Sequence, residues 1–493
     1  MGKRIKDFIL LGFGRGVIAL TSVLYIRVFT SLLSPAEVGR MNIILTVSGW
    51  FGLVLLNPVG MYMNRRLLEW EKEDRLRSGL NSWAVYLLGV SVFSVILLPV
   101  YRNFLGIAIH PLWLAALVAA GIVITMGNIS YAGFLNLMGH RFYFIAGSVL
   151  TLWSGLALSA LLVKNFTASA EFWLSGQLLG QALAFVLILW FFYKALPAVP
   201  DRAGPLPFFS AAAPVWNFSW PLSVSVFLYW IHTQGYRFLF QRAAGSEALG
   251  IFVVGFAIGS SLMLAFESLF NQFYQPIYYS KISHSSDEEK TAAWNRYASA
   301  FIPMVIVTAV FVAANGGAIA RIVASEKFRR GGDIIIWGAA AEGLRMIISM
   351  ISLVSHSKLK MSPIILPGVA GTLTLLCGLS VLMPLNPFIG AGSSIVFGWI
   401  VSGILLYFSM RKLLPVELPW GGIAHAALLS VPLAALRFSA GWGGGPGTVM
   451  GRSLVFLAFS TAFLFLAYAV LLHKWLPQQF KAELYAKINR FHF

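Results

Sequence analysis

Apolar stretches of about 20 residues recur from one end of this chain to the other, each long enough to cross roughly 30 Å of hydrocarbon. Of the 493 residues, 58% are hydrophobic and only 11% are charged. The pattern predicts an all-α polytopic membrane protein with about fourteen transmembrane helices. We place these spans near residues 8–32, 40–62, 81–101, 112–137, 144–164, 172–194, 216–240, 248–276, 298–320, 334–356, 361–383, 388–410, 419–437 and 453–475.

One polar turn between two apolar runs occurs twice in the chain. The first copy runs from Arg27 to Gly39 and reads RVFTSLLSPAEVG, and the second runs from Arg237 to Gly250 and reads RFLFQRAAGSEALG. In both copies an Arg near the end of an apolar run precedes small residues, a Glu, a Gly and a second apolar run. Such a repeat predicts two related lobes, as in transporters that rock around a central site.

The repeat and the span order predict two pseudo-symmetric six-helix lobes followed by a C-terminal helix pair. We assign residues 1–195 to the N-lobe, 196–215 to an interlobe linker, 216–413 to the C-lobe, and 414–493 to the last two helices and a basic tail. The linker contains the sequence LPAVPDRAGPLP, whose Pro and Gly content is typical of an irregular connection.

The chain carries a formal net charge of +18. Its basic residues are scattered over short loops and do not line one soluble face, so they do not indicate a nucleic-acid partner. Attraction to anionic lipid headgroups explains them, and their distribution favours cytoplasmic N- and C-termini in the cytoplasmic (inner) membrane. Basic residues of membrane proteins are usually concentrated in the cytoplasmic loops, which is the positive-inside rule. The main departure from it is the loop with Lys327, Arg329 and Arg330, which this orientation places outside.

Charged side chains inside the spans are the candidate functional residues, because a charge at the bilayer centre costs about 2.5–3.5 kcal/mol on insertion scales. Arg345 lies roughly 16 Å from either end of its span, beyond the reach of a side chain that extends to the interface. It is the first candidate for binding an anionic substrate. An ion pair with Glu342, one helical turn earlier, is the structural alternative.

Five further residues in the spans are candidates with a structural alternative. Arg15 and Arg27 of the first span lie about 120° apart around the helix, so they should not both face lipid. Arg237 takes the corresponding place in the second copy of the turn and is either a substrate ligand or an interfacial anchor. Glu267 is a candidate proton or cation carrier or an ion-pair partner for an Arg. His232 is a candidate coupling group, although an interior structural His is the commoner case.

The sequence indicates no cofactor and no metal site. Its one Cys, Cys377, lies in an apolar run, so there is no disulfide framework and no thiolate ligand set. We find no nucleophile motif, metal-ligand spacing or Gly-rich phosphate loop. We therefore expect a transporter without covalent catalysis, not an enzyme.

These residues resemble a known family. The turn Ser34-Pro-Ala-Glu-Val-Gly39 with Arg27 upstream, the pair Tyr236-Arg237 before Glu247-Ala-Leu-Gly250, and the span count are similar to the polysaccharide (O-antigen type) flippases of the multidrug/oligosaccharidyl-lipid/polysaccharide exporter superfamily. The resemblance covers most of the chain. Many relatives have an Asp before the second Arg, where this chain has Tyr236, so no role of that Asp is carried over.

The resemblance implies that the chain moves an undecaprenyl-diphosphate-linked oligosaccharide, such as a repeat unit of lipopolysaccharide O-antigen, from the inner to the outer leaflet. The two lobes would alternate access to a cationic cavity lined by Arg345, Arg15, Arg27 and Arg237. The charge agrees, because guanidinium groups bind diphosphate oxygens bidentately. The expected partners are this lipid-linked substrate, membrane lipids and a coupling cation, either proton or sodium.

Two alternatives remain open at this point. A cation-coupled multidrug exporter of the same superfamily would have the same lobes, but its cavity should be acidic or apolar. A membrane-embedded glycan polymerase or ligase should carry a large external loop with polar catalytic groups, and the longest polar segments here, near 64–80, 195–215 and 277–297, are too short for one.

Overall fold

The computed structural model describes residues 21–73, 75–106, 109–195, 208–282, 285–358, 360, 362–439 and 446–475. All regular structure in these residues is helical, which confirms the predicted fold class. Eleven of the described helices are long and apolar enough to cross a membrane, and two shorter apolar helices, Thr21–Leu32 and Trp420–Ala435, coincide with predicted spans. The total of about fourteen spans stays a prediction. The described chain divides into two compact units, Met1–Gly250 and Ile251–Phe493.

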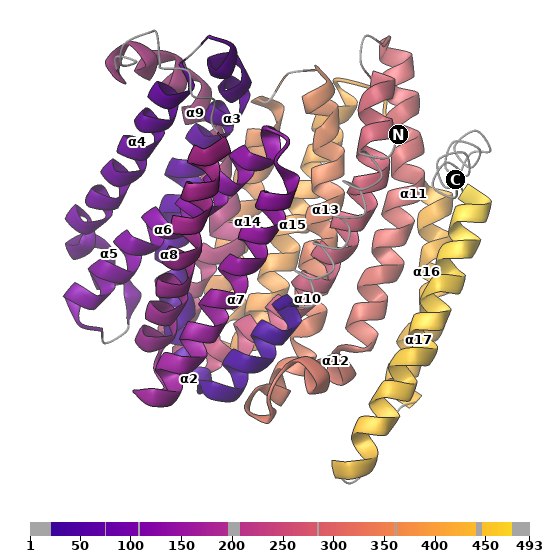
Figure 1. The fold of residues 1–493 in the computed structure, drawn as a ribbon. Coiled ribbons are helices and arrows are strands. Elements are labelled where there is room, and N and C mark those ends of the chain that lie inside the picture. Colours follow the sequence, from indigo (N-terminus) through magenta and orange to yellow (C-terminus); the bar gives the residue numbers. More distant parts are fainter. Residues whose placement is uncertain are drawn as a thin grey trace. The chain divides into compact units, whose positions relative to one another are not determined.

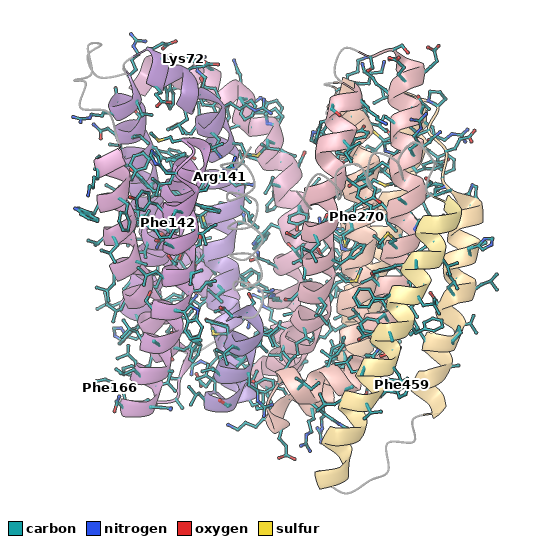
Figure 2. The ribbon with its side chains drawn as sticks, turned by 45° about the vertical axis from the view of Figure 1, so that its right-hand side comes forward. Lys72, Arg141, Phe142, Phe166, Phe270 and Phe459 are labelled. Carbon is teal, nitrogen blue, oxygen red and sulfur yellow. The ribbon has the colours of Figure 1, made fainter. Side chains whose placement is uncertain are left out.

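The first unit is a bundle of long helices (Figure 1). Lys72 lies at one end of this bundle and Phe166 at the other (Figure 2). A π-helix, which often accompanies a break in the α-helical ladder, precedes Pro58, whose missing N–H cannot continue that ladder. The elements are Thr21–Leu32, α2 (Pro35–Trp50), the π-helix η1 (Phe51–Leu56), α3 (Asn57–Lys72), α4 (Leu76–Ile96), α5 (Leu98–Leu105), α6 (Pro111–Leu137), α7 (Arg141–Asn165), α8 (Ala170–Ala195), α9 (Phe208–Trp230), the π-helix η2 (Ile231–Gly235) and the first part of α10 (Tyr236–Ile282).

Small residues hold α7 and α8 together. A Cβ atom added at Gly180 would lie 2.3 Å from the backbone of Ser154, and one added at Gly176 would lie 2.5 Å from the Cα of Ser159. The hydroxyls of Ser154 and Ser159 donate hydrogen bonds of 2.8 Å to the carbonyls of Gly180 and Trp173. Close backbone approach and interhelical hydrogen bonds are the main sources of helix association where lipid removes the hydrophobic driving force.

The second unit contains the rest of α10 and all later helices. Its helices α14 and α15 pair as α7 and α8 do, because a Cβ at Gly371 would lie 2.6 Å from the carbonyl oxygen of Gly398. The last two helices, α16 and α17, contact each other and α11 (Figure 1). The elements are α11 (Asp287–Ala314), α12 (Gly316–Val323), the 3₁₀ helix η3 (Glu326–Asp333), α13 (Ile335–Lys358), the 3₁₀ helix η4 (Ser362–Ile364), α14 (Ile365–Leu382), α15 (Pro387–Arg411), α16 (Trp420–Ser439) and α17 (Pro446–Trp475).

The predicted lobes, 1–195 and 216–413, stay predictions. Helix α9 begins at Phe208, inside the segment expected to be linker, where the run Ser210-Ala-Ala-Ala213 consists mostly of the best helix former. Helices α9 and η2 pack on α2, η1 and α3, and the division between the two compact units therefore falls after Gly250. Arg15, the remainder of the predicted linker and the basic tail after residue 475 lie outside the described residues.

Candidate functional site

The first copy of the duplicated turn is the capped beginning of α2. Ser34 is the N-cap, Pro35 is the first helical residue, and the Ser34 hydroxyl accepts a hydrogen bond of 3.3 Å from the Glu37 backbone N–H. A Ser cap followed by Pro is a favoured way to begin a helix, because the hydroxyl satisfies one of the free N–H groups and Pro lacks one.

The second copy turns at Gly245, whose φ of +81° and ψ of 174° are accessible almost only to Gly. Beside it, the Gln241 side-chain amide donates a hydrogen bond of 2.7 Å to the Ser246 hydroxyl. The long apolar stretch Ala212–Asn271 is therefore broken at the turn that the sequence repeat had marked.

The two copies of the turn contact each other through Gly39 and Gly250. A Cβ at Gly39 would lie 1.9 Å from the carbonyl oxygen of Ser246, and a Cβ at Gly250 would lie 1.8 Å from that of Pro35. When the two glycines are aligned, Ser246 falls opposite Pro35, so each copy makes the same contact with the other. Reciprocal contact of this kind characterises an interface between elements related by a two-fold axis.

Glu37 ties the first turn to the beginning of α8. One of its carboxylate oxygens accepts a hydrogen bond of 2.7 Å from the Ala170 backbone N–H, and the other accepts one of 2.9 Å from Arg40. Arg40 also donates to Glu171 at 2.5 Å. A carboxylate at a helix N-terminus is favoured by the helix dipole. Glu247 of the second copy is exposed, so the two Glu residues of the repeat have different surroundings.

Arg345 lies between two carboxylates in the second unit. Its Nε donates a hydrogen bond of 2.6 Å to Glu342, one terminal nitrogen donates to Glu267 of α10, and the other donates to the Ser349 hydroxyl at 3.1 Å. The side chains of Arg345, Glu267 and Glu342 are only 14%, 15% and 13% exposed. The ion pair with Glu342 is thus present, and Glu267 joins it across the helices. With both carboxylates ionised, these three groups carry one net negative charge.

An aromatic cluster follows Glu267 along α10 and continues on α11. The rings of Phe270 and Tyr274 stack with centroids 4.0 Å apart, and Phe270 contacts Phe301 at 4.8 Å. The Tyr297 hydroxyl donates a hydrogen bond of 2.8 Å to Asn271. These rings are buried, so they pack the core beside the ion-pair cluster and are not an open platform for sugar rings.

Arg237 and His232 lie where α2 meets the beginning of α10. The Arg237 guanidinium donates to the Thr46 hydroxyl at 3.3 Å, and the Trp230 indole donates to the Thr46 carbonyl at the same distance. His232 is only 3% exposed, and its ring forms a hydrogen bond with the backbone of Leu228. In this conformation Arg237 therefore links two helices within the first unit.

Arg27 points away from the core of its own unit. Tyr25 and Phe29, on the opposite face of the same helix, pack against the Trp173 ring of α8 at 5.6 and 6.2 Å, and the Tyr25 hydroxyl donates to Gln177. Arg27 itself is exposed. Arg27 and Arg237 thus lie in the first unit and Arg345 in the second, and their role as ligands of an anionic substrate stays a prediction.

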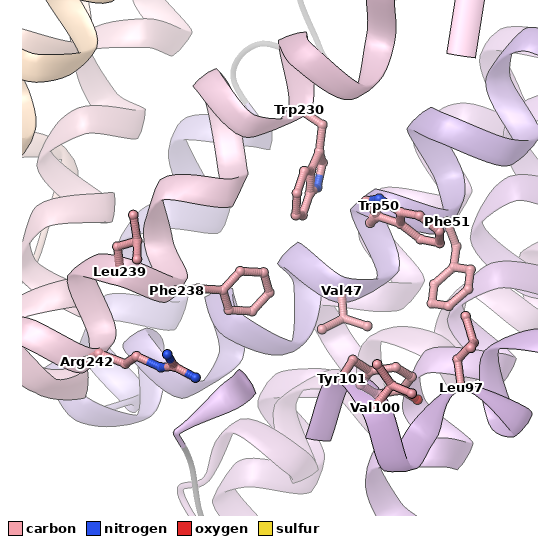
Figure 3. A pocket seen from close by; sticks show the side chains of 10 residues that line it. All are labelled: Val47, Trp50, Phe51, Leu97, Val100, Tyr101, Trp230, Phe238, Leu239 and Arg242. Atoms are coloured by element: carbon pink, nitrogen blue, oxygen red, sulfur yellow. The ribbon is translucent and has the colours of Figure 1, made fainter. Parts of the chain in front are cut away.

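A cavity of about 490 Å³ lies in the first unit, between α2 with η1, the junction of α4 with α5, and the end of α9 with α10 (Figure 3). Trp230, Trp50 and Phe51 line it, and the guanidinium of Arg242 is the charged group of its lining. Size and apolar character match small-molecule and lipid sites. In the described residues, no group of three His, Cys, Asp or Glu side chains is arranged to hold a metal ion.

No protein-family model and no curated protein sequence matches the chain. Solved structures do match it over most of its length. An inward-closed lipid II flippase, MurJ, aligns with a TM-score of 0.71 and 15% identity over 95% of this chain and 98% of its own. An inward-facing MATE-family multidrug resistance transporter of the MOP superfamily aligns with a TM-score of 0.56 and 15% identity, covering 88% of this chain and 99% of its own.

A MOP-superfamily transporter from Pyrococcus furiosus, described as having a binding pocket of reversed polarity, aligns with a TM-score of 0.53 and 16% identity, covering 88% of this chain and 96% of its own. At such identities the likeness concerns the fold. The chain is a multi-pass membrane protein with the fold shared by a lipid II flippase and the MATE transporters of the MOP superfamily.

Proposed function

We propose that this protein is a flippase that moves an undecaprenyl-diphosphate-linked oligosaccharide across the cytoplasmic membrane by alternating access. The observation that carries the proposal is the reciprocal contact of the duplicated turns at Gly39 and Gly250, in a chain whose fold matches that of a lipid II flippase over nearly its full length. In the predicted lobes one turn belongs to each lobe. Separation of these glycines would then open the space between the lobes to one side of the membrane.

The contact has the properties of a reversible gate. Backbone atoms meet through glycines, which allows tight van der Waals packing that a rigid-body rotation breaks without rupturing a salt bridge. A gate that must open in every transport cycle needs two states that differ by only a few kcal/mol.

The cluster of Glu267, Arg345 and Glu342 supplies a coupling device in this proposal. With both carboxylates ionised the guanidinium is more than neutralised, so it attracts an anionic headgroup weakly. When a proton neutralises one carboxylate, Arg345 can direct part of its fork to a diphosphate oxygen. Arg27, which is exposed, and Arg15 would provide the remaining positive charge.

The alternative is a cation-coupled multidrug exporter of the same superfamily. Two observations favour it as a second candidate: the MATE-like fold and the excess of carboxylate over guanidinium at Arg345. A cationic drug would pair with the carboxylates, whereas a lipid diphosphate would pair with the guanidinium.

One set of variants separates the two functions. Glycan at the cell surface and efflux of a cationic dye are measured in cells that lack the chromosomal gene and carry Arg345→Ala, Arg345→Lys, Glu267→Gln or Glu342→Gln. We expect Arg345→Ala to abolish surface glycan, compared at equal amounts of inserted protein, and Arg345→Lys to restore part of it. Arg411→Ala, at the exposed end of α15, is the matched control.

Normal glycan export by Arg345→Ala would reject the proposed role of Arg345. Recovery of export when Glu267→Ala and Glu342→Ala are added to Arg345→Ala would show that the cluster is structural. Dye efflux that requires the two carboxylates, in cells whose surface glycan does not depend on the gene, would establish the multidrug alternative.

A further inference from the structure

A short segment of the second unit carries four basic residues that the proposed transport function does not use: Arg321, Lys327, Arg329 and Arg330. The segment, residues 316–333, consists of α12 and η3 and joins α11 to α13, which are both long and apolar enough to cross a membrane. It therefore lies at a surface of the membrane, at one end of α11 (Figure 1). We call it the α12–η3 platform. In the predicted orientation this surface is the outer one, where the positive-inside rule does not account for basic residues.

The backbone of the platform is held in place by close packing. Phe328 is fully buried, with 0% exposure. A Cβ at Gly316 would lie 2.8 Å from the Gly332 carbonyl oxygen, and one at Gly255 of α10 would lie 2.3 Å from the Gly331 carbonyl oxygen. These contacts fix η3 against both α12 and α10. A ligand of the basic side chains therefore binds without having to order the backbone of a loop, which lowers the entropic cost of binding.

The exposed side of the platform has an excess of positive charge. Its four basic residues stand against two acidic ones, Glu326 and Asp333, which leaves a formal net charge of +2. Glu326 pairs with Arg329 at 2.6 Å, but their side chains are 78% and 57% exposed, and solvent screens such a pair. Arg330 is exposed, and no carboxylate of the described residues pairs with it. The platform therefore presents positive charge that an external anion can reach.

Two guanidinium groups of the platform repel each other. Partial burial and the nearby charge of Arg329 lower the pKa of the Arg321 guanidinium below its ordinary value. An Arg side chain does not lose its proton in a protein at physiological pH, so the repulsion persists. A phosphate that contacts both groups relieves it, because its oxygens accept charge-assisted hydrogen bonds from more than one guanidinium.

The anion that fits this place is the headgroup of a bilayer lipid. Because the platform joins two spans, its basic side chains lie at the depth of the lipid headgroups. The apolar side chain of Ile336 is exposed in the first turn of α13, so the basic surface passes into an apolar one within a helical turn of Asp333. Such a change is typical of segments that lie in the membrane interface. A phospholipid meets both surfaces, whereas a soluble anion meets only the charges.

We propose that the α12–η3 platform binds the headgroup phosphate of one anionic phospholipid of the surrounding leaflet, through Arg321, Arg329 and Arg330. The acyl chains of this lipid extend along α13 past Ile336. The site is separate from the Arg345 cluster and does not depend on the proposed transport function.

The bound lipid also acts on α10 beside the second turn. A Cβ at Gly331 would lie 3.3 Å from the carbonyl oxygen of Ile251, the residue that directly follows Gly250 in the chain. A lipid that holds η3 therefore stabilises the position of α10 at this point.

The test measures the affinity of the purified full-length protein for lipids by native mass spectrometry. The probes are phosphatidylglycerol, phosphatidylcholine with the same acyl chains, undecaprenyl phosphate and glycerol phosphate. We expect phosphatidylglycerol to bind more tightly than phosphatidylcholine. Arg330→Gln should weaken its binding about fivefold and the Arg329→Gln/Arg330→Gln double variant about 25-fold, whereas Glu326→Gln should strengthen it about fivefold, because it removes a negative charge from the same surface.

Hydrogen–deuterium exchange locates the bound lipid. Phosphatidylglycerol should slow amide exchange in residues 316–333 of the unaltered protein and should not do so in the double variant. The matched control is Arg102→Gln, which removes an exposed basic residue of the first unit and should leave both measurements unchanged. The three altered residues of the platform are exposed, so their replacement should not prevent folding.

Equal affinity for phosphatidylcholine, an equal loss in Arg102→Gln, or no protection of residues 316–333 would each overturn the proposal. Displacement of phosphatidylglycerol by glycerol phosphate would overturn it in favour of a site for a soluble phosphate. Displacement by undecaprenyl phosphate would overturn it in favour of a site for a lipid-linked substrate.

Discussion

Gly39 and Gly250 occupy equivalent places in the two copies of the turn, and each lies against the backbone of the other copy. The contact leaves no room for a methyl group at either position, since the carbonyl oxygens lie 1.9 and 1.8 Å from where it would be. Glycine is therefore required at both positions because the two turns approach each other closely. An unusual backbone conformation is not the reason, since both glycines have ordinary helical geometry.

Replacement of Gly39 by Ala should destabilise the structure described here by about 1–3 kcal/mol, because the turns must separate to admit the methyl group. Gly250→Ala should have a similar effect, and the double variant should cost less than the sum, since one separation relieves both clashes. Thermal unfolding in detergent measures this. Gly89→Ala, with nothing within 4 Å of the added Cβ, should be neutral or stabilising, and an equal loss there would refute the steric explanation.

Removal of Glu37 should destabilise the first unit, whereas removal of Glu247 should not. Glu37→Ala loses the hydrogen bond to the Ala170 backbone N–H and one partner of Arg40. The free energy of unfolding should fall by about 1–2 kcal/mol, because the carboxylate caps the N-terminus of α8 and interacts favourably with its dipole. Glu247 is exposed, so Glu247→Ala should change the unfolding free energy by less than about 0.5 kcal/mol. Equal effects on the melting temperature would contradict this assignment of Glu37.

Arg345→Met should be more destabilising than either Glu267→Gln or Glu342→Gln. Loss of the Arg leaves two carboxylates with 15% or less exposure close together without their cation, a change that typically costs about 3–5 kcal/mol. Loss of one carboxylate leaves a one-to-one ion pair. Chemical or thermal unfolding of the purified variants gives the order of their stabilities. An Arg345→Met variant as stable as the two Glu variants would show that Arg345 does not stabilise the two carboxylates in this way.

The predicted orientation can be tested by thiol labelling of a variant in which the exposed native Cys377 is first replaced by Ser. Glu247→Cys, in the second turn, should react with an impermeant reagent in intact cells. Glu71→Cys, an exposed position near the end of α3, should react only after permeabilisation, because the positive-inside rule places that end in the cytoplasm. The reverse labelling pattern would show that the topology is the inverse of the predicted one.

Patterns that depend on neighbouring residues could be predicted from the sequence. Long apolar runs with few charges specify membrane helices, since only a helix satisfies its own backbone groups in lipid, and most predicted spans coincide with described helices. The repeat of the turn, and the spacing that lets Glu342 meet Arg345, are equally local properties of the chain.

Contacts between distant segments could not be predicted in this way. The sequence marks Gly39 and Gly250 as parallel positions, but only the packing of the two turns brings each onto the other's backbone. Glu267 joins Arg345 from another helix, and Glu37 reaches the beginning of α8 while Glu247 remains exposed. The sequence by itself determined an all-helical membrane protein with a duplicated turn. The tertiary structure decided which charges are neutralised and which glycines meet, because both depend on the rotation and separation of whole helices.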